Sequence, residues 1–201
     1  NLDPASLNGP PPPGKRFLLK SPVHTARIDL LLEMFPRAQF VYVYRDPLAV
    51  WRSAAHMADT TYWFTYLSKP SDAHIQHFIL EQYKMLHTEY QKQKPQLLKL
   101  EEEETGSGGG NLGGRLHEVR FEDLDRDKLG VIKQLYTKLG WGWGAEEEKR
   151  VGGYIASLDG YKKNSKKKLG HYSGESDSEL SALLRSELAG AFKDLGYEPP
   201  Q

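Results

Sequence analysis

The pattern of apolar and polar positions predicts two short strands, each followed by a helix, in the first third of the chain. The run "FLLK" at 17–20 is short and apolar, as in a buried strand, and "QFVYVY" at 39–44 is apolar on both faces. Between them, Ser21 and Pro22 suit the cap and first position of a helix, and apolar residues recur at helical spacing over 28–35. Strand, helix, strand and helix form a βαβ unit with a parallel sheet, so the predicted fold class is α/β.

The rest of the chain predicts several helices and one further strand. A long amphipathic helix begins near Ile75, and Pro95 is expected to end or kink it. The segment "LHEVRFEDL" at 116–124 predicts an alternating strand followed by a turn. Amphipathic patterns then predict helices at 129–139, 146–158 and 178–195.

Two stretches lack the pattern of a packed core. Residues 1–16 are rich in proline and glycine and predict an extended or disordered lead-in. Residues 101–114, "EEEETGSGGGNLGG", join an acidic run to a glycine-rich run and predict a solvated, low-complexity insertion. The remaining sequence is expected to form one domain over 17–201.

Composition and charge narrow the possible functions. The chain carries 27 basic and 27 acidic residues, so attraction of the whole protein to nucleic acid is not expected, and an anion site must come from a local cluster. It has no cysteine, which excludes disulfides, thiolate zinc sites and a cysteine nucleophile, and we predict no metal site. No apolar run approaches the length of a membrane span. The segment "GPPPPGKR" at 9–16 mimics a phosphate-binding loop, but its four prolines donate no N–H, so we exclude that function.

The stretch "RDPLAVWRS" places an arginine, a helix cap and a serine at the end of the second predicted strand. Asp46 and Pro47 suit the cap and first position of a helix. Ser53 lies seven residues after Asp46, which at about 100° per residue returns it to the same face. The guanidinium of Arg45 and the hydroxyl of Ser53 can then converge on one anion. The structural alternative is that Arg45 pairs with a carboxylate and Ser53 bonds its own backbone.

Residues 17–53 resemble the central region of sulfotransferases that use 3′-phosphoadenosine-5′-phosphosulfate (PAPS), a group sharing "LLKSPxHxxRLxxLLxxFPxARFVxxxRDPxxVxxS". "VRFEDL" at 119–124 and "YTKLGW" at 136–141 resemble later family segments, and the C-terminal "YKKNSKKKLGHYS" and "FKDLGY" are a looser match. The resemblance implies a P-loop-NTPase-like, three-layer α/β sandwich around a central parallel sheet. It also implies transfer of a sulfuryl group from PAPS to a hydroxyl or amine of a small-molecule, carbohydrate or peptide acceptor.

The same resemblance assigns roles to individual residues. Arg45 and Ser53 correspond to the arginine and serine that bind the 3′-phosphate of the donor. Lys20 corresponds to the cation at the leaving oxygen, and the alternative is a surface lysine. His24 is the candidate general base, although in the cytosolic branch of the family this histidine follows the lysine by two positions and here by four. The alternative for His24 is a helix-start histidine that bonds backbone.

The lysine run at 162–168 leaves two functions open. In the family a basic loop near the C-terminus closes over the 3′-phosphate, which implies donor binding by Lys163 and Lys168. The alternative is a non-catalytic α/β module that binds anionic partners through the run.

One family motif has no match in this sequence. It is the upstream strand, loop and helix of the type "GxPRSGTT", which grips the 5′-phosphosulfate. We therefore expect a sandwich that is incomplete at the N-terminus, with a strand edge or face exposed. The chain is then either a fragment of an enzyme or a degenerate member that binds adenosine 3′,5′-bisphosphate without catalysis. Its location, cytoplasm or Golgi lumen, is left open, with any signal or anchor expected upstream.

Overall fold

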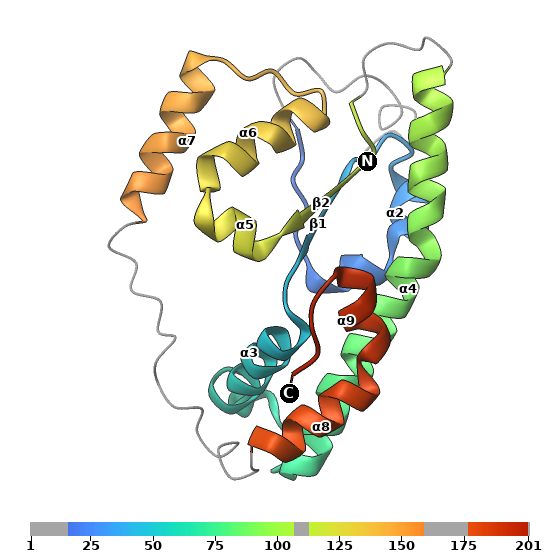
Figure 1. Cartoon of the computed structure of the whole chain (residues 1–201), viewed down its shortest axis with the longest axis vertical. Helices are drawn as coiled ribbons and strands as arrows, with labels where there is room; N and C mark the ends of the chain where they lie inside the picture. Colours follow the sequence, from blue (N-terminus) through green and yellow to red (C-terminus); the bar gives the residue numbers. More distant parts are fainter. Residues whose placement is uncertain (1–15, 107–112, 159–176, 201) are drawn as a thin grey trace.

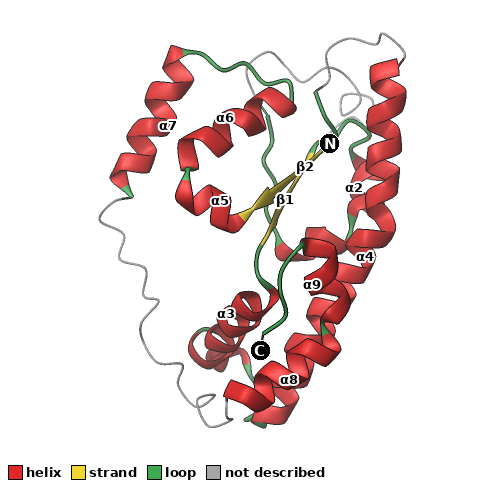
Figure 2. Cartoon of the chain, in the orientation of Figure 1, coloured by secondary structure: helices red, strands yellow, loops and turns green. Residues whose placement is uncertain are grey.

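The computed structural model describes residues 16–106, 113–158 and 177–200, and Figure 1 shows their helices arranged around one small sheet. Helix predominates in this mixed α/β chain, as the colours of Figure 2 show. The elements, with η for a 3-10 helix, are η1 Pro22–Ala26, α2 Ile28–Met34, β1 Phe40–Tyr44, α3 Pro47–Thr60, η2 Tyr62–Thr65, α4 Asp72–Gly106, β2 Leu116–Arg120, α5 Phe121–Arg126, α6 Lys128–Lys138, α7 Ala145–Ser157, α8 Asp177–Glu187 and α9 Ala189–Leu195.

In the described part of the chain the sheet consists of β1 and β2, which run parallel. Tyr44 at the end of β1 pairs with Arg120 at the end of β2, so the carboxyl ends of both strands lie at one edge. Parallel strands need a long crossover, and here it runs through α3 and α4. Figure 1 shows α2 and α4 on one side of the sheet and α5 and α6 on the other. The predicted α/β class and the presence of a parallel sheet are confirmed, with β2 in place of residues 17–20 as the partner of β1.

Residues 17–20 do not form the predicted strand. They have no ladder partner among the described residues, and Phe17 and Leu18 are 97% and 86% exposed. An apolar run gains little as a strand unless a neighbouring strand satisfies its backbone and covers its side chains. The helix predicted after it is divided into η1 and α2, and the Ser21 side chain caps neither. The prediction of a βαβ unit that begins at Phe17 was therefore wrong.

Strand β1 is well covered on one face only. On that face the ring of Tyr42 stacks on the ring of Tyr90 in α4, with centroids 3.9 Å apart, and Tyr90 is 1% exposed. On the opposite face Val41 and Val43 are 39% and 50% exposed, although Val119 on the paired strand is buried. The predicted burial on both faces was thus wrong for one face of β1, and the expected exposed sheet face is present there.

Helix α4 is longer than its sequence predicts. Pro95 lies inside the helix and does not end it. Tyr90 and Leu97 on either side of the proline are 1% and 0% exposed, so burial of this face stabilises a helix that has lost one backbone hydrogen bond. The helix continues over 101–106, which places the acidic half of the expected insertion in α4, and 107–112 lie outside the described residues.

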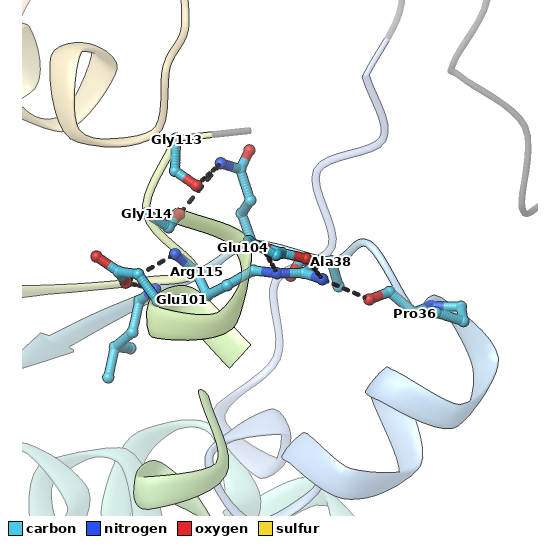
Figure 3. Close-up of polar contacts among 9 residues, drawn as sticks. Pro36, Ala38, Glu101, Glu104, Gly113, Gly114 and Arg115 are labelled. Atoms are coloured by element: carbon cyan, nitrogen blue, oxygen red, sulfur yellow. Dashed lines mark hydrogen bonds and ion pairs between the residues drawn. The ribbon is translucent and has the colours of Figure 1, made fainter. Parts of the chain in front are cut away.

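Two glutamates of this acidic run bind Arg115, just before β2 (Figure 3). Arg115 is 4% exposed, and its Nε and Nη2 donate to the two carboxylate oxygens of Glu104 at 2.8 and 2.5 Å. Its Nη1 and Nη2 also donate to the carbonyl oxygens of Ala38 and Pro36, both at 2.9 Å. Glu101 Oε2 accepts the backbone N–H of Arg115 at 2.9 Å. The acidic run is therefore part of the packed fold, contrary to what its composition predicts.

A hydrophobic core joins α3 and α4 to the C-terminal helices. Trp51, Leu184 and Phe192 are 3%, 0% and 1% exposed within it. The single helix predicted at 178–195 is two helices, α8 and α9, which meet at Leu188. Helices α6 and α7 match their predictions, and the predicted turn after β2 is the short helix α5.

Candidate functional site

The corner between β1 and α3 forms as the cap and proline predict. Asp46 is the N-cap of α3, and its Oδ1 accepts the backbone N–H of Ala49 at 2.7 Å. Pro47 occupies the first turn and is buried. Trp51 and Ala55 face the core, which leaves the side of the second turn that carries Ser53 exposed to solvent.

Arg45 and Ser53 are both exposed at this corner. The guanidinium carbon of Arg45 lies 4.7 Å from the centroid of the Phe121 ring, at the start of α5. Among the described residues, Arg45 has no carboxylate partner and the Ser53 hydroxyl has no hydrogen bond. The structural alternative for these two side chains is therefore not found in the described part of the chain.

A second group of side chains lies at the same edge of the sheet and was missed in the sequence. Tyr197, which follows α9, donates its hydroxyl to Glu122 Oε2 at 2.5 Å. The guanidinium carbon of Arg120 lies 4.3 Å from the centroid of the Tyr197 ring, and the Tyr44 ring meets that ring edge-on at 6.2 Å. Arg120 and Glu122 lie in "VRFEDL" and Tyr197 in "FKDLGY", and neither motif indicates that Glu122 and Tyr197 touch across 75 positions of sequence.

The Glu122 carboxylate ties the two strand ends together. Partial burial acts to raise the pKa of Glu122, but the hydrogen bond from Tyr197 and the backbone N–H groups of Glu122 and Asp46 outweigh burial and lower it. Burial, followed by the bond to Glu122, raises the pKa of Tyr197 to about 12. The site therefore holds a charged carboxylate beside the backbone that carries Arg45, with a neutral phenol donating to it.

Lys20 and His24 lie on the segment before α2. Lys20 is exposed in the extended stretch, and His24 is half-buried in η1, which packs on α4. The Nδ1 atom of His24 is buried and has no hydrogen-bond partner among the described residues. No hydrogen bond or ion pair in the described ranges joins either side chain to Arg45 or Ser53.

The remaining predicted site residues are lysines of the C-terminal run. Lys163 and Lys168, with the whole run at 162–168, lie outside the described residues. Within the described ranges, no three histidine, aspartate or glutamate side chains are grouped as a metal site would require. No described helix combines the length and the hydrophobicity needed to cross a bilayer.

The arrangement at the carboxyl edge suits an anion. Ligands of parallel α/β sheets bind beyond the carboxyl ends of the strands, which is where Arg45 and Phe121 lie. A planar guanidinium on an exposed side chain binds phosphate or sulfate oxygens in pairs. A serine hydroxyl on the next helix adds a neutral donor.

Comparison with known proteins agrees with this chemistry. A model of the sulfotransferase family matches residues 5–145. The chain is 33% identical, over 153 residues, to the omega-hydroxy-beta-dihydromenaquinone-9 sulfotransferases of Mycobacterium bovis and Mycobacterium tuberculosis; the match covers 75% of this chain and 35% of theirs. The chain thus spans about a third of the length of these relatives. No solved structure matches it. The matched residues include β1, α3, β2 and the Arg45 corner, and the chain therefore belongs to the sulfotransferase family.

Proposed function

We propose that this chain forms the donor-nucleotide side of a PAPS-dependent sulfotransferase that transfers a sulfuryl group to a hydroxyl or amine. The observation that supports a donor site is the exposed guanidinium of Arg45, which has no acidic partner among the described residues and lies at the carboxyl edge of the parallel strands. We assign the 3′-phosphate of the donor to Arg45 and Ser53, and expect Lys163 and Lys168 to close over it. In the complete protein we expect a P-loop-NTPase-like three-layer sandwich.

The reaction assigns a role to the two residues before α2. An acceptor hydroxyl loses its proton to His24 as its oxygen attacks the sulfur, and the bond from sulfur to the phosphate oxygen breaks. Adenosine 3′,5′-bisphosphate leaves with the electron pair, and the Lys20 ammonium stabilises the charge on the leaving oxygen. Because Nδ1 of His24 is buried, the proton would be taken at Nε2.

The acceptor is proposed from the relatives. Both mycobacterial proteins are named for an omega-hydroxy menaquinone derivative, which favours a hydroxyl acceptor over an amine for this chain. A hydroxyl needs a base and an in-line approach to sulfur, which a histidine near the donor site would supply.

Binding of adenosine 3′,5′-bisphosphate tests the donor site, since the chain spans a third of its relatives and binding does not require turnover. Calorimetric titration is expected to give about tenfold to a hundredfold weaker binding for Arg45→Ala, because charge-assisted hydrogen bonds contribute about 1.5–3 kcal/mol. Arg150→Ala is the matched control, since Arg150 is an exposed arginine on α7 that pairs with Glu146. Equal affinities for wild type and Arg45→Ala would rule out the assignment.

A further inference from the structure

The side chain of Arg45 is held by an aromatic ring. Its guanidinium carbon lies 4.7 Å from the centroid of Phe121, within the range of a cation–π contact. Arg45 is exposed, whereas Phe121 is half-buried at the start of α5. A long exposed side chain ordinarily samples many rotamers, so this stack restricts the positions of the guanidinium.

The kind of contact determines which N–H donors of Arg45 remain available to a ligand. A carboxylate partner would occupy the N–H groups in the guanidinium plane. A cation–π contact with an aromatic ring takes up no oxygen acceptor, so the N–H groups stay available for an anion. The stack therefore orders the cation and preserves its capacity for a bidentate bond to an anion.

The sheet register brings the two side chains together. Tyr44 and Arg120 are the last paired residues of strands that lie about 4.8 Å apart, and Arg45 and Phe121 directly follow them. The following residues also lie close together, because the backbone N–H of Asp46 helps to lower the pKa of the Glu122 carboxylate. The register of the paired strands therefore holds the Phe121 ring next to the guanidinium of Arg45.

We propose that Phe121 is a positioning residue of the donor site, which orders Arg45 for the 3′-phosphate through its ring face. The inference rests on the proposed function, since it gives Phe121 its role only through the bond of Arg45 to that phosphate. A preorganised guanidinium loses less side-chain entropy on binding, so the ring contributes to affinity without touching the phosphate.

A double-mutant cycle on binding of adenosine 3′,5′-bisphosphate tests the proposal. Phe121→Leu is expected to weaken binding about two- to fivefold, which corresponds to the strength of an exposed cation–π contact. Phe121→Tyr retains an aromatic ring and should bind adenosine 3′,5′-bisphosphate with wild-type affinity. In the Arg45→Ala background, Phe121→Leu should have no further effect. Phe121→Met, which also lacks a ring, gives a second non-aromatic variant if the leucine variant folds poorly.

Three results would overturn the inference. If Phe121→Leu weakens binding by the same factor with and without Arg45, the ring contacts the nucleotide itself or supports the fold. If Arg45→Ala loses affinity while Phe121→Leu and Phe121→Met do not, the ring has no positioning role and the donor site stands. If Arg45→Ala binds as tightly as wild type, the donor-site assignment fails and the positioning role fails with it.

Discussion

The pair of hydrogen bonds from Arg115 to Glu104, called the fork below, allows a sharp test of whether the acidic run belongs to the fold. The perturbation is Glu104→Gln, which removes the charge and keeps the shape. Its matched control is Glu103→Gln, one residue earlier on α4. Glu103 forms a surface pair with Lys99 at 3.7 Å, with 59% and 75% of the two side chains exposed. The two variants remove the same charge from neighbouring positions of one helix, and of the two side chains Glu104 is the one that binds the buried Arg115.

The magnitude follows from the contacts of Arg115. Glu104 accepts two charge-assisted hydrogen bonds from a side chain that is 4% exposed, while its own side chain is 27% exposed. Glutamine keeps one acceptor oxygen, so one such bond is lost, and hydrogen bonds to charged groups contribute about 1.5–3 kcal/mol. We expect the free energy of unfolding to fall by about 2 kcal/mol for Glu104→Gln. For Glu103→Gln the loss should stay below about 0.5 kcal/mol.

Urea unfolding followed by circular dichroism measures both values under the same conditions. Thermal unfolding should agree, with a midpoint about 4–8 °C lower for Glu104→Gln in a chain of this size. Equal losses for the two variants would refute the reasoning. The acidic run would then be solvated in solution, as its composition predicts, and the fork would not stabilise the protein.

Three further variants test other contacts. Asp46→Ala removes the cap of α3 and should lower the free energy of unfolding by about 1 kcal/mol, whereas Asp46→Asn should retain most of it in thermal unfolding. Tyr197→Phe removes the bond to Glu122 and should cost about 1.5 kcal/mol in urea unfolding, but little in a Glu122→Gln background. Burial acts to raise the pKa of Glu101, but hydrogen bonds from Lys138 and from backbone N–H groups outweigh burial, so the pKa is lowered overall. Its stabilisation is therefore present above the ordinary value of 4.5 and lost as pH falls through the folded pKa, so wild type should lose stability more steeply below pH 4.5 than Glu101→Gln.

Features that depend on neighbouring residues were predictable from the sequence. Asp46 and Pro47 determine the start of α3 because a cap and a fixed φ angle act within one turn. The apolar run of β1, rich in β-branched and aromatic residues, and the alternating pattern of β2 each predicted a strand from local sequence. The resemblance of residues 17–53 and 119–124 to sulfotransferases gave the family, which the matches confirm.

Features that depend on distant residues were not predictable. The run at 17–20 is apolar enough for a strand, but a strand also requires a partner, which local sequence does not reveal. Pro95 predicts a helix end, and only the buried face of α4 explains why the helix continues. The contacts of Arg115 with Glu104 and of Tyr197 with Glu122 join residues 11 and 75 positions apart, and no periodicity signals such pairs.

The long crossover between β1 and β2 has a consequence for folding kinetics. About 70 residues separate the strands, and the entropy lost on closing a loop grows as (3/2)RT ln n, so direct pairing of two short strands is slow. Helix α4 contacts both ends of this loop, because Tyr90 stacks on Tyr42 of β1 and Glu104 binds Arg115 beside β2. A preformed α4 shortens the effective search between the strands. We therefore expect substitutions that weaken α4 to slow the assembly of the sheet.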